Sequence, residues 1–166
     1  MGSKETIDYI NKEKRLLRPY NLISPSPGKG FEIFNSKNGY KVAVLNLMGN
    51  IFMKKCDDVF EAAKKFTLNK VLKKDYDLLV VDIHGEITSE KMAMGHFFDG
   101  QATLVIGTHT HVPTSDTMIL KKKFEKHYPA IGEATLCGSI IECDIESGLA
   151  KNIKQFIYGG MLKNSN

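Results

Sequence analysis

The sequence predicts an α/β fold built around a mixed β-sheet. Two apolar runs rich in β-branched residues, 77–83 and 102–107, are typical of strands buried on both faces, because their apolar residues are nearly continuous. A helical segment between them, residues 88–98, completes a right-handed βαβ unit with parallel strands. Asn38-Gly39 lies between two further strand-like runs and predicts an antiparallel hairpin.

Capping and turn signals place the other elements along the chain. Asp57 or Asp58 is expected to cap a helix, since an aspartate oxygen accepts hydrogen bonds from the first free backbone amides. Thr88 or Ser89 is expected to cap the next helix, and Glu90 in its first turn suits the positive end of the helix dipole. The predicted elements are helix 4–14, strands 31–35 and 40–47, helix 58–74, strand 77–83, helix 88–98, strand 102–107, and a closing hairpin of 134–144 and 149–158.

Length and composition indicate one globular domain spanning residues 1–166. No apolar run approaches the roughly 20 residues that cross a bilayer, so no membrane partner is expected. The net charge of +4 comes from dispersed lysines, which are typical of solvated surface and do not favour nucleic-acid binding. Cys56, Cys137 and Cys143 form no C-x-x-C pair, so we expect reduced thiols in a cytoplasmic protein.

Three histidines follow the two apolar runs and are the candidate functional residues. His84 comes after the first run, and His109 and His111 come after the second. Open α/β sheets bind ligands beyond the carboxyl ends of their strands, and neutral imidazole is the commonest metal ligand in proteins. The spacing therefore predicts a metal site, whose affinity should fall as the histidines are protonated. The simpler alternative is loop histidines that hydrogen-bond to backbone carbonyls.

Other polar residues offer weaker candidates. Asp82 shares a strand face with His84, which leaves open a mononuclear site of histidine and carboxylate. Gly28-Lys29-Gly30 lacks the full spacing of a phosphate-binding loop, so turn chemistry explains it better. His96 and His127 have no comparable context and are expected to be structural or exposed.

Several motifs resemble those of the calcineurin-like metallophosphoesterases, and more narrowly their bacterial cyclic-nucleotide phosphodiesterase branch, the YmdB-like family. The resemblance covers most of the chain up to Leu120, and the tail from Ala134 resembles the family's closing hairpin. The matching segments are Arg18-Pro19, Pro27-Gly-Lys-Gly30, Val44-Leu-Asn-Leu-Met-Gly49, Val81-Asp-Ile-His-Gly-Glu-Ile-Thr-Ser-Glu-Lys91, Met94-Gly95, Asp99-Gly100 and Gly107-Thr-His-Thr-His-Val-Pro-Thr-Ser-Asp116.

The resemblance implies a fold of two facing mixed sheets flanked by helices, of which this chain carries only part. It also implies a phosphodiesterase acting on cyclic nucleotides or other small phosphodiesters, with His84, His109 and His111 as metal ligands. Two divalent ions, iron or manganese with zinc or magnesium as alternatives, would activate water for attack on phosphorus. Members often form symmetric oligomers, so a homo-oligomer is an open expectation. The residues alone assign no general acid or base.

The family's G-D-x-x-G, N-G-E-N and G-N-H motifs, and a T-D-x-G-M-x-G segment after Leu120, have no match in these 166 residues. Three neutral imidazoles offset none of the charge of two divalent ions, so we expect the 166 residues alone not to be catalytically competent. Either the molecule carries these pieces outside the chain or it is a shortened form. The sheet edges that shortening would expose favour the first. The alternative function is an inactive remnant that serves as a binding or oligomerisation module.

Overall fold

The computed structural model describes residues 4–111 and 136–159. The chain forms two compact units: residues 1–110 with 143–150, called the first unit, and residues 111–142 with 151–166, called the second unit. The expectation of a single domain over residues 1–166 stays a prediction. None of the helices in the described ranges has the length and apolar character needed to span a bilayer.

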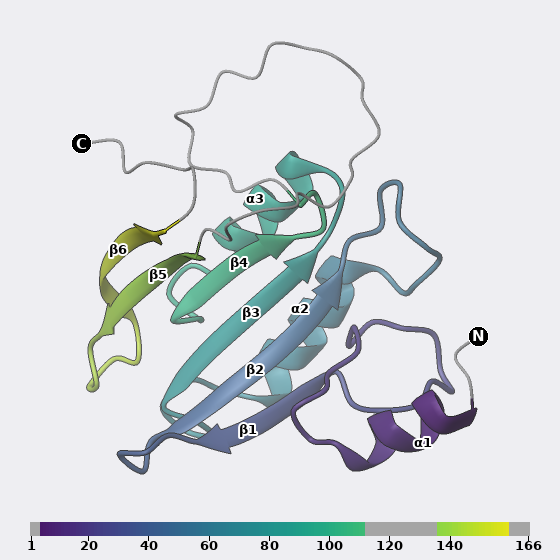
Figure 1. Ribbon diagram of the computed structural model, residues 1–166, viewed down its shortest axis with the longest axis horizontal. Coiled ribbons are helices and arrows are strands. Elements are labelled where there is room, and N and C mark those ends of the chain that lie inside the picture. Colours follow the sequence, from purple (N-terminus) through teal and green to yellow (C-terminus); the bar gives the residue numbers. More distant parts are fainter. Residues whose placement is uncertain (1–3, 112–135, 160–166) are drawn as a thin grey trace. The chain divides into compact units, whose positions relative to one another are not determined.

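The first unit contains a four-stranded mixed sheet in the order β1-β2-β3-β4 (Figure 1). β1 pairs with β2 in antiparallel fashion, whereas β2, β3 and β4 run parallel to one another. The predicted α/β class with a mixed sheet is therefore confirmed. The strands are β1 (Phe31–Asn35), β2 (Lys41–Met48), β3 (Leu78–His84) and β4 (Leu104–Thr108).

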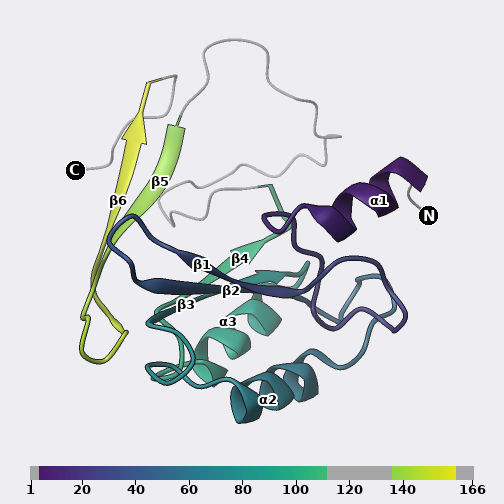
Figure 2. The ribbon, with the colours of Figure 1, turned by 90° about the horizontal axis from the view of Figure 1, so that it is seen from below.

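The described residues of the first unit also form three helices, α1 (Lys4–Lys12), α2 (Val59–Asn69) and α3 (Thr88–Phe97). Helices α2 and α3 cover the same face of the sheet (Figure 2). Their apolar side chains bury one side of the central strands and form the core. Its largest fully buried members are Leu45, Leu47, Val59, Phe66, Leu79, Val81, Ile83, Met94 and Phe98.

Burial along β3 alternates, so the prediction that this strand is buried on both faces is wrong. Leu79, Val81 and Ile83 are fully buried, whereas Asp82 and His84 on the other face are half-buried. β4 is also only partly buried. An apolar run alone does not reveal that both neighbouring helices pack on the same side.

The predicted helix boundaries agree in part with the structure. The Asp58 carboxylate caps α2 by accepting a bond of 2.8 Å from the Glu61 amide, as one of the two expected caps. α2 ends at Asn69 rather than near Lys74, because Lys70 is extended and a turn follows. α3 begins at Thr88 with Ile87 before it, so neither Thr88 nor Ser89 is its cap.

Both predicted hairpins are confirmed. The Asn38-Gly39 turn joins β1 to β2, with Gly39 at a φ of +83°. The closing hairpin consists of β5 (Leu136–Cys143) and β6 (Ala150–Tyr158), which form a two-stranded sheet. Its turn belongs to the first unit, where the Thr103 hydroxyl donates a hydrogen bond to the Gly148 carbonyl.

Candidate metal centre

Two neighbouring parallel strands of the first unit, β3 and β4, end at or next to histidines that were predicted to be metal ligands. His84, the last residue of β3, pairs in register with Thr108, the last residue of β4. His84 also pairs with Met48 at the end of β2. His109 directly follows β4. The histidines therefore lie at the carboxyl edge of the parallel strands, where α/β sheets bind ligands.

The structure brings His84 and His109 into direct contact. Nδ1 of His109 lies 3.1 Å from Nε2 of His84, and the two ring planes are at 87° to each other. The backbone of His109 has a φ of +104°, a conformation that side-chain-bearing residues seldom adopt. A non-glycine residue held in such a conformation is typical of functional sites rather than of ordinary loops.

A series of side-chain hydrogen bonds holds the His84 ring at its Nδ1 atom. Nδ1 of His84 lies 3.1 Å from Oγ1 of Thr108, which in turn lies 2.7 Å from Oδ1 of Asp82. The second oxygen of Asp82 accepts a bond of 2.8 Å from the side-chain amide of Asn46. Both Asp82 oxygens are thus engaged by the protein, and this carboxylate reaches His84 only through Thr108.

His109 has a carboxylate partner of its own. Oε2 of Glu86 lies 3.0 Å from Nε2 of His109, and the side chains of His109 and Glu86 are 34% and 47% exposed. The paired imidazoles are therefore open to solvent on the side of Glu86. On its other side, the His84 ring contacts the half-buried Thr108 side chain.

The separation of the facing nitrogens fits two ligands of one metal ion. With metal–nitrogen bonds of about 2.1 Å, two adjacent ligands stand about 3.0 Å apart around an octahedral ion and about 3.4 Å apart around a tetrahedral one. The observed 3.1 Å lies within this range. Imidazole nitrogen is a suitable donor for iron, manganese and zinc. The pair therefore fits two positions of one ion.

The remaining predicted candidates are placed as follows. His111 begins the second unit, is exposed and has a φ of +55°, and its role as a ligand stays a prediction. His96 is exposed on α3, as expected, and His127 lies outside the described residues. Within residues 4–111 and 136–159, no group of three or more His, Cys, Asp or Glu side chains is arranged to hold a metal.

Glu90 near the same edge is buried, which its predicted place in the first turn of a helix did not indicate. Glu90 is 7% exposed, and its Oε1 accepts a bond of 2.8 Å from the Asn50 amide. Its Oε2 occupies the space beside Gly49, where a side chain on that residue would stand. Only the packing of α3 reveals that Glu90 faces inward.

Burial raises the pKa of the Cys56 thiol, and the nearby charges of Asp57 and Glu90 raise it further. The thiol is therefore protonated at neutral pH.

The glycine-lysine-glycine segment supports the turn interpretation. The Gly28 amide donates to Oδ1 of Asn11 at 2.8 Å, and the Lys29 ammonium pairs with Glu32 at 2.8 Å. The groups that would hold a phosphate are thus already bonded within the protein.

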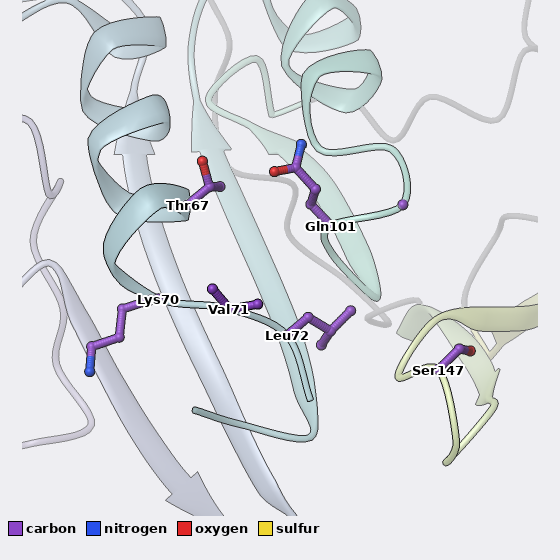
Figure 3. Close-up of a pocket in the computed structure, with 7 residues that line it drawn as sticks. Thr67, Lys70, Val71, Leu72, Gln101 and Ser147 are labelled. Atoms are coloured by element: carbon purple, nitrogen blue, oxygen red, sulfur yellow. The ribbon is translucent and has the colours of Figure 1, made fainter. Parts of the chain in front are cut away.

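A shallow cavity of about 200 Å³ lies elsewhere in the first unit. Leu72 and Gln101 line it from the segments that lead into β3 and β4, at the ends opposite His84 and His109 (Figure 3). The cavity is therefore not the metal centre. Its complete lining is Thr67, Lys70, Val71, Leu72, Gly100, Gln101 and Ser147.

Comparison with known sequences identifies relatives over most of the chain. The model of a family described as YmdB-like protein matches residues 2–125. A 2',3'-cyclic-nucleotide 2'-phosphodiesterase of Bacillus subtilis is 32% identical over 186 residues, which covers 93% of this chain and 69% of the relative. A putative phosphatase/phosphodiesterase of Mycoplasma genitalium is 35% identical over 162 residues and covers 94% of this chain. The chain spans only 54% of that relative's length.

Solved structures of similar fold give a consistent result. A hypothetical protein from Thermus thermophilus superposes with a TM-score of 0.73 at 28% identity, over 93% of this chain and 71% of that structure. A phosphatase from Mycoplasma pneumoniae also has a TM-score of 0.73, at 26% identity, over 94% of this chain and 68% of that structure. The described architecture is therefore that of a phosphatase fold.

Proposed function

The chain belongs to the YmdB-like family, and from this membership we propose that it is a metal-dependent phosphoesterase that hydrolyses cyclic nucleotides or other small phosphodiesters. The observation that carries the proposal is the pair of facing imidazole nitrogens, 3.1 Å apart at the carboxyl edge of the parallel strands. The name of the Bacillus subtilis relative supports the substrate class. Cytoplasmic location and a homo-oligomeric state belong to the same proposal.

His84 and His109 are the proposed ligands at this edge, and His111 is the proposed third ligand. When bound, a divalent ion supplies positive charge that stabilises the phosphoryl oxygens in the transition state and makes water a better nucleophile. The family resemblance favours two ions of iron or manganese. The facing nitrogens of His84 and His109 provide donors for one of them.

Neighbouring side chains hold the two histidines in place. The Asp82–Thr108 pair holds the His84 ring at its Nδ1, while Glu86 bonds the outer nitrogen of His109. The half-exposed Glu86 side lets a small phosphodiester approach the imidazole pair. The neighbouring Cys56 thiol is protonated and is not the proposed nucleophile.

The test is hydrolysis of 2',3'-cyclic AMP and of a chromogenic phosphodiester by the purified protein with added Mn²⁺. If the molecule carries the family motifs that have no match in these 166 residues, we expect turnover that His84→Ala and His109→Ala each abolish. His96→Ala is the matched control, because this exposed histidine on α3 lies outside the site, and its turnover should equal that of the wild type. Unchanged turnover in His84→Ala would refute the assignment.

The alternative is a non-catalytic family member that acts as a binding or oligomerisation module. The lack of a group of three or more ligands within the described residues favours it. It predicts no turnover by the wild-type protein with any of Mn²⁺, Fe²⁺ or Zn²⁺, and a metal content of at most one ion per chain.

A further inference from the structure

The hydrogen bonds that link His84 to Thr108 and Thr108 to Asp82 determine which ring nitrogen of His84 carries the proton. The Thr108 hydroxyl has a single proton, and Oδ1 of Asp82 at 2.7 Å is an acceptor. The hydroxyl therefore donates to Asp82. Towards Nδ1 of His84, 3.1 Å away, the same oxygen acts as acceptor, so Nδ1 must carry the hydrogen.

The other nitrogen of the ring then has its lone pair free. In a neutral imidazole only one nitrogen is protonated, so Nε2 of His84 is left as an acceptor. This is the atom that faces Nδ1 of His109 at 3.1 Å. A metal also binds imidazole through an unprotonated nitrogen. The hydrogen bonds at Nδ1 thus present Nε2 in the form that a metal requires.

We infer that Thr108 and Asp82 are positioning residues, which hold His84 with Nδ1 protonated and with the Nε2 lone pair directed at the metal site. The inference rests on the proposed function, because it assigns these residues a purpose in metal binding. Metal-binding histidines commonly donate their second N–H to a carboxylate or carbonyl, and here a hydroxyl stands between ring and carboxylate.

The hydrogen-bonded residues around His84 lie on paired strands of the sheet. Asp82, His84 and Thr108 lie on the paired strands β3 and β4, and Asn46 on β2 holds the far oxygen of Asp82. Regular strands fix these four side chains relative to one another more tightly than a loop would. His109, just outside the strand, has Glu86 as its only carboxylate partner within the described residues.

The two nitrogens of His84 give separate signals in two-bond ¹H–¹⁵N correlation spectra, which identify the protonated nitrogen directly. We would record these spectra on metal-free wild type, Thr108→Val, Thr108→Ser and Asp82→Ala, and assign His84 by its absence in His84→Gln. The wild type and Thr108→Ser should show Nδ1 protonated. Thr108→Val removes the acceptor and Asp82→Ala frees the hydroxyl to donate, so both should lose this preference.

Titration with Mn²⁺ measures the consequence for metal binding. Loss of such an outer partner typically weakens metal affinity about 10- to 100-fold, which we expect for Thr108→Val, with recovery in Thr108→Ser. Thr67→Val is the matched control, since the Thr67 hydroxyl bonds only the Lys64 carbonyl on α2. Its affinity and its His84 signals should match the wild type.

The outcomes separate this inference from the proposed function. Protonated Nε2 in wild-type His84, or an unchanged His84 spectrum in Thr108→Val, overturns the inference. Spectra that behave as expected in a wild type that fails to bind any Mn²⁺ support the role of Thr108 and Asp82 in fixing the ring. The same result refutes the metal-dependent function.

Discussion

Gly30 offers a sharp test of how the first unit is held together, because a methyl group there meets backbone. A Cβ on Gly30 would lie 2.6 Å from the Tyr20 nitrogen and 2.7 Å from Tyr20 Cβ, and still closer to Tyr20 Cα. Contacts under 3.0 Å force one segment to move. The segment around Tyr20 is therefore expected to separate from Gly30 in Gly30→Ala.

The cost follows from the hydrogen bonds at this position. The Tyr20 amide donates to the Asn46 carbonyl at 2.7 Å, and the Asn46 amide donates to the Gly30 carbonyl at 3.0 Å. Each such bond contributes about 0.5 to 1.5 kcal/mol net. Gly30→Ala should also weaken the packing of Tyr20 on Phe66. Together these losses should lower the free energy of unfolding by about 2 to 4 kcal/mol. For a chain of this length that lowers the melting temperature by about 5 to 15 °C.

Two other glycines serve as matched controls in the same thermal unfolding assay. Gly95 on α3 has open space around a Cβ, so Gly95→Ala should stabilise the helix by about 0.5 to 1 kcal/mol. A Cβ on Gly107 would meet the flexible Lys91 side chain at 2.8 Å, so Gly107→Ala should cost less than about 1 kcal/mol. A Gly30→Ala melting temperature within 2 °C of the wild type would refute the steric argument.

Burial, with a smaller contribution from Asp75, raises the pKa of Tyr76 to about 12. The unfolded chain loses the Tyr76 proton near pH 10, before the folded one, so the unfolding free energy should fall by up to about 2 to 3 kcal/mol from pH 10 to 12. Urea titrations of Tyr76→Phe should lack this fall, because the titrating hydroxyl is gone. The control Tyr158→Phe, which changes an exposed tyrosine, should keep it. Asp58→Ala removes the α2 cap and should cost about 1 kcal/mol by urea titration, whereas no change would show that the Glu61 amide finds another partner. Mn²⁺ should raise the melting temperature of the wild type and have little effect on His84→Ala, since an ion stabilises only a folded state that binds it. An equal rise in both proteins would place the ion elsewhere.

The sequence alone determined the local elements and the edge of the sheet that carries the candidate site. Asn38-Gly39 predicted the first hairpin, and Asp58 was one of two expected caps of α2. The position of His84 after an apolar run placed it at a strand end. These features depend on near neighbours in the chain, so their signals survive in the order of residues.

Only the tertiary structure decided which side chains meet at that edge. His84 and His109 are 25 residues apart in sequence, and their contact at 3.1 Å depends on the parallel register of β3 with β4. The same register places the Thr108 hydroxyl where it bonds both Asp82 and His84. This contact joins two strands, so the residue spacing within either strand does not predict it. Helix packing on a single face buries Glu90 and leaves Asp82 half-buried. Register and the choice of covered face arise from long-range packing, which local periodicity does not specify.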